Sequence, residues 1–183
     1  MADASATKVV TGKVRLSYVH LFEAFTNTEG QEPKYSVVLL IPKTDAKTIR
    51  DLRAAQKAAL ENGKDSKFQG KIPTGWKDTI HDGDESADLD RNPEYEGHWY
   101  MSVSSKTRPG IVDENVLPIL DSTQVYSGCF ARVSINAFPY ANSGNKGVSF
   151  GLNHVQKMGD GEFLGGRSKA EDDFDAVESE SLI

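Results

Sequence analysis

Residues 129–138 have the sequence CFARVSINAF, and their alternation predicts a β-strand with two unlike faces. One face is small and apolar and suits a barrel interior; it holds Cys129, Ala131, Val133, Ile135 and Ala137. The other face is polar and aromatic; it holds Phe130, Arg132, Ser134, Asn136 and Phe138. Rings beside an arginine suit unstacked bases, because rings stack on bases while the guanidinium reaches phosphate. On this strand alone, a second packed layer under a loop or a partner subunit is the more common explanation.

Two further stretches repeat this mixture of aromatic, basic and hydroxyl side chains. Residues 98–106 alternate between an apolar row of Trp99, Met101 and Val103 and an outward row of Tyr100, Ser102, Ser104 and Lys106. Residues 8–19 alternate between one row of Val10, Val14, Leu16 and Tyr18 and an outward row of Thr11, Lys13, Arg15 and Ser17. Repetition over three strands favours a binding surface over ordinary solvated strands.

The loop PTGWKD adds two candidates, although Trp76 serves equally well as a lid on the core. Arg108 follows the outward row of residues 98–106 in the next turn. The predicted nucleic-acid-binding residues are therefore Lys13, Arg15, Trp76, Lys77, Tyr100, Lys106, Arg108, Phe130, Arg132 and Phe138.

The rest of the pattern predicts a mainly β domain with one helix. Residues 34–41 are continuously apolar, so we expect a strand covered on both faces and ended by Pro42. Residues 44–63 form the helix, capped by Thr44 or Asp45, with a stripe of Ile49, Leu52, Gln56 and Leu60 and a stop at Gly63. Roughly five strands favour an antiparallel barrel of the OB type, with a β-sandwich as the alternative. The helix follows the second predicted strand instead of the third, so either the first strand is split by a bend or the topology is modified.

Charge divides the chain into a neutral body and an acidic tail. Six of the 27 acidic residues lie between Glu171 and Ile183, which leaves 21 acidic and 21 basic residues in positions 1–170. A sequence pI of about 5.2 argues against a nucleic-acid partner. A neutral body can nevertheless concentrate Lys and Arg on one face.

Other classes of function find little support. No signal pattern or membrane-spanning run is present, and a single cysteine fits a protein of the cytoplasm. We expect no cofactor, no structural zinc and no catalytic residue, because the familiar catalytic and phosphate-binding motifs are missing. The acidic stretch 81–90 does not match an EF-hand, so we expect a solvated loop there in preference to a metal site.

Taken together, the chain resembles phage-encoded single-stranded-DNA-binding proteins. The resemblance includes TGKVRLSYVHLFEA at 11–24, KYSVVLLIPK at 34–43, SGCFARVSINAFPY at 127–140, GVSFGLNHVQKMGDGEFLGG at 147–166 and the acidic tail. It implies an OB-fold domain over 1–166 and a flexible tail over 167–183. It also implies a protein that coats single-stranded DNA in phage replication or recombination, in the host cytoplasm.

The chain is distantly similar to the replication single-strand-binding proteins of short-tailed phages, whose acidic tail ends in an aromatic residue. This chain ends in SLI, and Phe174 is the aromatic residue of its tail. The resemblance implies that the tail, through Asp172, Asp173, Phe174 and Asp175, recruits replication and recombination proteins. Tethering also lets it compete with DNA for Lys13, Arg15, Arg108 and Arg132.

Alternatives stay open. If the tail neither competes with DNA nor recruits partners, it is a disordered segment that keeps the protein soluble. The alternative to a single-stranded-DNA-binding protein is an acidic DNA mimic, inhibitor or structural phage protein that binds a basic target. A metal-dependent nuclease is a further alternative with less support. A homodimer is also open.

Overall fold

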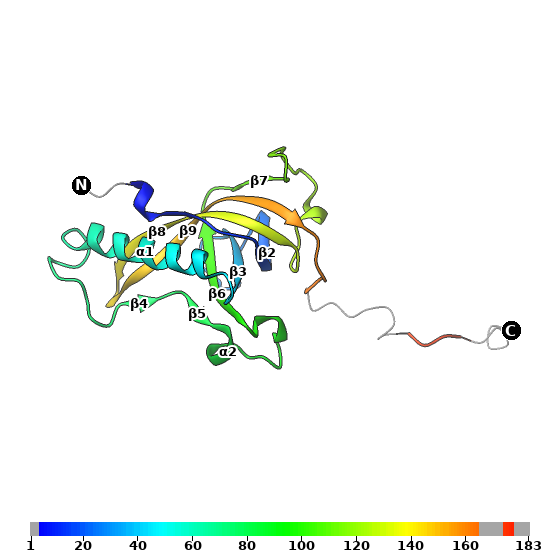
Figure 1. Cartoon of the computed structure of the whole chain (residues 1–183), viewed down its shortest axis with the longest axis horizontal. Helices are drawn as coiled ribbons and strands as arrows, with labels where there is room; N and C mark the ends of the chain where they lie inside the picture. The colour runs from blue at the N-terminus through cyan, green and yellow to red at the C-terminus, as the bar shows by residue number, and fades with distance from the viewer. Residues whose placement is uncertain (1–3, 165–173, 178–183) are drawn as a thin grey trace.

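The computed structural model describes residues 4–164 and 174–177, and these residues are mainly β with two α-helices (Figure 1). The strands are β1 (Lys8–Val10), β2 (Val14–Phe25), β3 (Lys34–Pro42), β4 (Lys77–Asp78), β5 (His81–Asp82), β6 (His98–Ser105), β7 (Gly110–Val112), β8 (Phe130–Asn142) and β9 (Asn145–Gly159). The helices are α1 (Ala46–Gly63) and α2 (Gly83–Ser86), with 3₁₀ turns at Ala4–Thr7, Pro93–Tyr95 and Ser122–Gln124. None of the described helices is long and apolar enough to span a membrane.

All nine strands belong to one sheet, so the prediction of five strands and one helix is wrong in its counts. The physical reason is the shortness of the strands that were missed. The four strands that the sequence did not indicate separately, β1, β4, β5 and β7, have two or three residues each. An alternation of side chains cannot show in so few residues.

The five long strands pair in a closed circuit. β2 pairs with β3, β3 with β6, β6 with β9, β9 with β8, and β8 again with β2. The pair β6–β9 is parallel, through Ser104 and Gly151, and the other four pairs are antiparallel. The short strands lie on the flanks: β1 on β8, β4 and β7 on β9, and β5 on β6.

The core lies inside this circuit. The small apolar row of residues 129–137 is buried as predicted, and so are Met101 and Val103 of β6. Leu39, Leu40 and Ile41 of β3 are all fully buried, which confirms that this strand is covered on both faces. β3 ends at Pro42, also as predicted.

Helix α1 lies against β8 and follows β3, the second strand of the circuit (Figure 1). Asp45 caps it by accepting a hydrogen bond from the backbone N–H of Thr48 at 3.1 Å. The helix ends at Gly63, as predicted, but without a left-handed cap, because Lys64 after it has a right-handed helical conformation. Gly63 is instead needed for space: a Cβ there would lie 2.5 Å from Cβ of Pro139 in β8.

The first predicted strand is interrupted twice. The chain leaves the sheet after Val10 and re-enters it at Val14, so a bend separates β1 from β2. A shift of register follows between Ser17 and His20, where Tyr18 has a φ of 48°. The expected inward row is therefore wrong at both ends, because Val10 and Tyr18 are about half exposed.

Candidate nucleic-acid interface

The irregularity in β2 opens a groove on the outer surface of β2, β3 and β6. The groove has a volume of about 330 Å³, and the loop 26–33 closes one side of it. Its floor consists of small side chains, namely Ser36, Val38, Ser102 and Ser104. The rings of His20 and Phe25 stack in one wall with their centroids 4.1 Å apart and an angle of 6° between their planes.

The bulge is stabilised by contacts from other parts of the chain. The backbone N–H of Val19 donates to Oγ of Ser127 at 3.1 Å. The hydroxyl of Tyr18 donates to Oδ1 of Asn92 at 3.2 Å. Partial burial lowers the pKa of His20, so this ring is neutral at pH 7 and stacks without the cost of hiding a charge. Tyr18, His20 and Phe25 thus form an aromatic row along β2.

A second hollow continues the groove past Tyr18. It has a volume of about 410 Å³, and Tyr18 and His20 line both hollows. Arg91 and Leu164 lie on its far side. Lys34 lines the first hollow, so each hollow has a cation on its wall. Glu32 also lines the first hollow and Glu94 the second, so the rings lie between two pairs of opposite charges.

Sequence reasoning did not select the aromatic row. Strict alternation from Val14 assigns Tyr18 to the interior, because a one-residue shift moves every later side chain to the other face. Tyr is not a residue that signals a positive φ, so nothing in the local sequence marks the bulge. The signal that was present is composition: Tyr18, His20, Phe22 and Phe25 crowd one short segment.

The predicted residues in and directly after β6 lie near this groove. Tyr100 points outward, as predicted, but contacts the rings of Tyr95 at 5.0 Å and His81 at 5.2 Å. Burial raises the pKa of Tyr95 to about 12. Lys106 pairs with Glu32 of the groove wall at 3.5 Å, and the guanidinium of Arg108 lies 5.6 Å from the ring centre of Phe22.

Three predicted residues meet where the chain leaves the body. Nζ of Lys13 lies 5.0 Å from the ring centre of Phe130, and Cζ of Arg15 lies 5.8 Å from it. Arg15 donates to the carbonyl oxygens of Gly128 at 3.2 Å and Glu162 at 2.9 Å. The segment around Gly161 passes so close that a Cβ there would lie 2.9 Å from the Phe130 ring. Phe130 is therefore partly covered by a loop.

The remaining predicted residues lie in other places. Arg132 donates to the carbonyl oxygen of Thr11 at 3.2 Å. Phe138 is 43% exposed near the far end of β8. Trp76 packs against the core, as the lid alternative requires, while Lys77 is exposed on β4. The ten residues thus form several patches around the circuit and not one surface.

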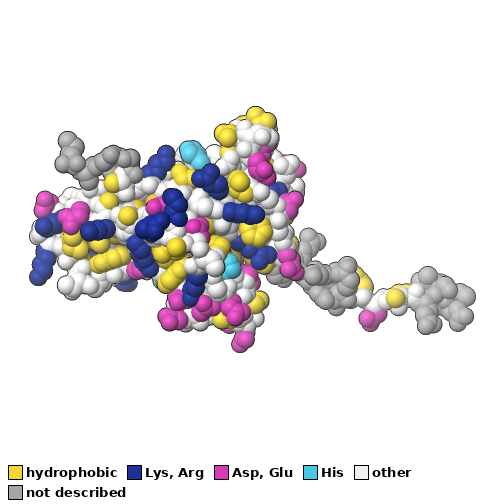
Figure 2. All heavy atoms as spheres, viewed as in Figure 1, with side chains coloured by type: hydrophobic (Ala, Val, Ile, Leu, Met, Phe, Trp, Pro, Cys, Tyr) yellow, Lys and Arg dark blue, Asp and Glu magenta, His cyan; other side chains and the backbone are white. Residues whose placement is uncertain are grey.

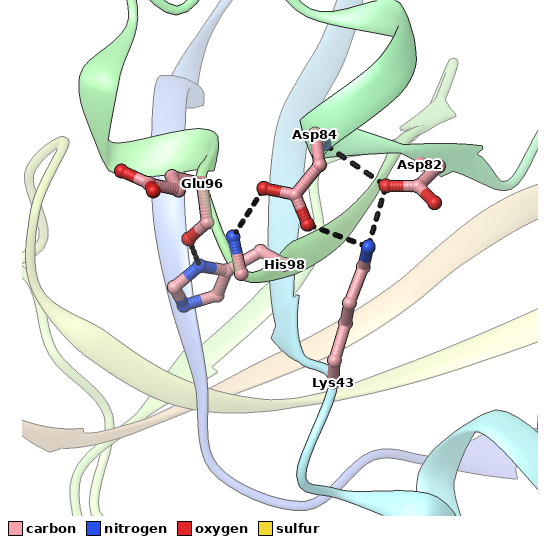
Figure 3. A network of polar contacts seen from close by, with 6 residues as sticks. Lys43, Asp82, Asp84, Glu96 and His98 are labelled. Carbon is pink, nitrogen blue, oxygen red and sulfur yellow. Dashed lines mark hydrogen bonds and ion pairs between the residues drawn. The ribbon is translucent and has the colours of Figure 1, made fainter.

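An ion-pair network ties the acidic stretch 81–90 to the body (Figure 3). Nζ of Lys43 lies 2.6 Å from a carboxylate oxygen of Asp82 and 2.6 Å from one of Asp84. Asp84 also accepts from the backbone N–H of Gly97 at 2.9 Å. The hydrogen bond from Lys43 holds the pKa of both carboxyls below the usual range. Within the described residues, no three His, Cys, Asp or Glu side chains are grouped to hold a metal ion.

A mainly β body with a ring-lined groove and cations at its walls is an arrangement found in single-stranded-nucleic-acid-binding proteins. Solved proteins of that class have similar structures. The single-stranded DNA-binding protein from bacteriophage Enc34, in complex with ssDNA, matches with a TM-score of 0.73 and 28% identity over 87% of this chain and 90% of that one. The single-stranded DNA-binding protein gp2.5 of bacteriophage T7 matches with a TM-score of 0.63 over 94% and 95% of the two chains. At 14% identity, this second likeness shows the fold alone.

The chain belongs to the family described as "Enterobacter phage Enc34, ssDNA-binding protein", whose model matches residues 7–182. A relative, protein p50 of Acyrthosiphon pisum secondary endosymbiont phage 1, is 33% identical over 187 residues, which cover 96% of this chain and 98% of p50. The resemblance to phage single-stranded-DNA-binding proteins that the sequence indicated is therefore confirmed.

Proposed function

We propose that this protein binds single-stranded DNA with little base preference, and so protects and organises it during phage replication or recombination. The observation that carries the proposal is the aromatic row of Tyr18, His20 and Phe25 between two cation-bearing hollows. Every base has a face that stacks on a ring, so such a row binds without reading sequence. Membership of the family supports the same function.

The closed circuit is best described as an OB barrel with four short added strands. An OB fold binds oligonucleotides on the face of its second and third strands and with the loop between its first and second. In the circuit β2–β3–β6–β9–β8, these parts are β3, β6 and the loop 26–33. The same parts line the groove. The groove thus lies where the fold is expected to bind.

The walls of the groove supply the cations. Lys34, Arg91, Lys106 and Arg108 lie in or beside it, and Lys13 and Arg15 lie where the chain leaves the body. If about five phosphates are neutralised, log K falls against log salt with a slope of roughly −3.5. As a phage protein that binds DNA, this protein would act in the cytoplasm of the host cell.

The acidic tail, residues 167–183, competes with DNA for the same cations and recruits replication or recombination proteins. Leu164 lines the second hollow, and Arg15 holds the carbonyl of Glu162, so the tail begins beside the groove. Asp172 and Asp173 lie outside the described residues, whereas Phe174 and Asp175 are described and exposed. We take 1–166 as the binding domain.

The test is fluorescence anisotropy of the full chain with single-stranded oligonucleotides of different sequence and with a duplex. We expect similar affinity for all single strands, weaker binding to the duplex, and the salt slope given above. Absence of single-strand affinity would overturn the proposal and leave an acidic inhibitor as the better description. Incubation of the same oligonucleotides with Mg²⁺ distinguishes binding from cleavage.

A further inference from the structure

A basic cleft lies apart from the groove, between residues 68–77 and the tip of the β8–β9 hairpin. Its volume is about 530 Å³, and three lysines, Lys71, Lys77 and Lys146, line it. None of these ammonium groups pairs with a carboxylate of the described residues, and no described acidic residue lines the cleft. The cleft therefore keeps three unneutralised positive charges.

The local structure keeps these charges together. Gly147 lies against Lys77, where a Cβ would be 2.4 Å from the carbonyl oxygen of Lys77, so β4 approaches the hairpin closely. The neighbouring carboxylate of Asp78 is engaged elsewhere, because it accepts from Arg53 at 2.6 Å and from Gln56 at 2.8 Å. Figure 2 shows Lys and Arg side chains at this end of the molecule, with some Asp and Glu beside them, and a larger group of Asp and Glu around α2.

The β8–β9 hairpin, whose two strands contain no Asp or Glu, connects the groove to the cleft. Ser104 of the groove floor pairs with Gly151 of β9, and β9 reaches Lys77 through Gly147. Four residues of strand correspond to roughly 13 Å. Residues 125–159, which include both strands of the hairpin, contain no Asp or Glu. The hairpin itself therefore places no carboxylate along this path.

An aromatic ring, that of Phe138, also lies between the groove and the cleft. Phe138 pairs with Ser149, between Gly151 and Gly147, and 43% of its surface is exposed. An exposed ring between small residues offers a further stacking position. We propose that the phosphate backbone of a single strand leaves the groove, passes Phe138 and is held by Lys71, Lys77 and Lys146 as a second phosphate-binding site. This inference rests on the proposed function.

The test compares two variants with the same change of charge. In the first, Lys71, Lys77 and Lys146 are changed to Gln; in the control, the exposed Lys8, Lys47 and Lys57 are changed to Gln. Anisotropy with oligothymidylates of graded length is recorded over a series of salt concentrations. On long oligonucleotides, we expect the slope of log K against log salt to be shallower by about 2 in the first variant, from ~0.7 per phosphate. The control keeps the slope of the unchanged protein.

The length of the oligonucleotide distinguishes the possible results of this experiment. On the shortest oligonucleotide that binds, which fills the groove alone, the first variant should equal the unchanged protein. Equal slopes at every length would overturn the second site while leaving the proposed function intact. An equal loss at every length would overturn it too, because the lysines would then belong to the groove. Absence of binding by the unchanged protein would refute the proposed function itself. Circular dichroism confirms that both variants are folded.

Discussion

Tyr18 combines an unfavourable backbone conformation with an exposed ring. Its φ of 48° lies in the left-handed region, which costs an L-residue roughly 1–2 kcal/mol. Strain of this kind is retained mainly where the rest of the structure enforces it, often at functional sites. Here the shift of register turns Tyr18 outward and places His20 and Phe25 in the groove wall.

The aromatic row should therefore contribute directly to binding. Phe25→Ala and Tyr18→Ala should each weaken single-strand binding by roughly 1–3 kcal/mol, because each removes one stacking face. Both rings are about half exposed, so thermal unfolding should change little. Ile135→Ala is the control: it is fully buried and should cost about 2–5 kcal/mol of stability. Unaltered affinity in both ring variants would place the stacking surface elsewhere.

The ion pairs of Lys43 should make stability depend on pH in a defined window. The hydrogen bond from Lys43 lowers the pKa of Asp82 and Asp84 below 3.8, so the folded state binds these protons less readily than the unfolded chain. Their contribution is complete above pH 3.8 and is lost as the pH falls through the lowered values.

We therefore expect Lys43→Gln to unfold at a lower temperature than the unchanged protein at pH 7. The difference should stay constant down to about pH 4 and shrink below it. Lys47→Gln is the matched control, because Lys47 pairs with Asp51 on the exposed side of α1. Calorimetry over pH 2.5–7 makes the comparison, and a difference that persists at the lowest pH would show that charge is not the cause.

Among the elements, β8 could be predicted and β2 could not. The alternation of residues 129–138 is regular, and both faces have the composition that their surroundings require. In β2 the same reasoning fails from Ser17, which was expected to face outward and is buried, because the register shift depends on Ser127 and Asn92, which lie far away in the sequence. β8 also has shifts of register against β9, but the extra residues, Asn153 and Met158, lie on β9, so β8 itself keeps its alternation.

The end of α1 shows how packing overrides a local signal. Gly63 is buried within the last turn, and its missing side chain makes room for Pro139. Gly63→Ala should therefore destabilise the protein by about 1–2 kcal/mol, since overpacking outweighs the gain in helix propensity. Asn62→Ala, one residue earlier and exposed, should be neutral or slightly stabilising. Urea unfolding of the two variants tests this, and a more stable Gly63→Ala protein would show that Pro139 yields without cost.

At the scale of the whole molecule, the sequence indicated the family and the buried rows but not the arrangement of the site. The groove joins β2, β3 and β6 with a loop, and the network of Lys43 joins residues about forty positions apart. Such neighbours follow from strand pairing, which a single sequence does not reveal. Most of the predicted binding set was taken from the outward rows of three strands, and these residues lie in several patches around the circuit.

The tail should regulate affinity for the whole molecule. Ending the chain after Lys169 removes six acidic residues and leaves a nearly neutral body. Affinity for single strands should rise, most clearly at low salt, because screening already weakens the tail at high salt. Changing Asp172, Asp173 and Asp175 to Asn should reproduce part of the gain at full length. Anisotropy at two salt concentrations compares the variants; equal affinities at low salt would mean that the tail does not compete.

Closure of the circuit also determines how the protein acquires its fold. The pair β2–β8 joins Arg15 to Phe130. Until the hairpin of β8 and β9 arrives, β2 presents an unpaired edge, and so does β6 beyond its short pairing with β5. During synthesis, the sheet therefore cannot close until the last third of the chain has been made. Until then, its unpaired strand edges can pair with those of other nascent chains. Contacts between residues so distant make folding slow, on the order of milliseconds to seconds for such topologies. A cell that produces this protein in quantity must accommodate a long interval between the exit of β2 from the ribosome and its protection from aggregation.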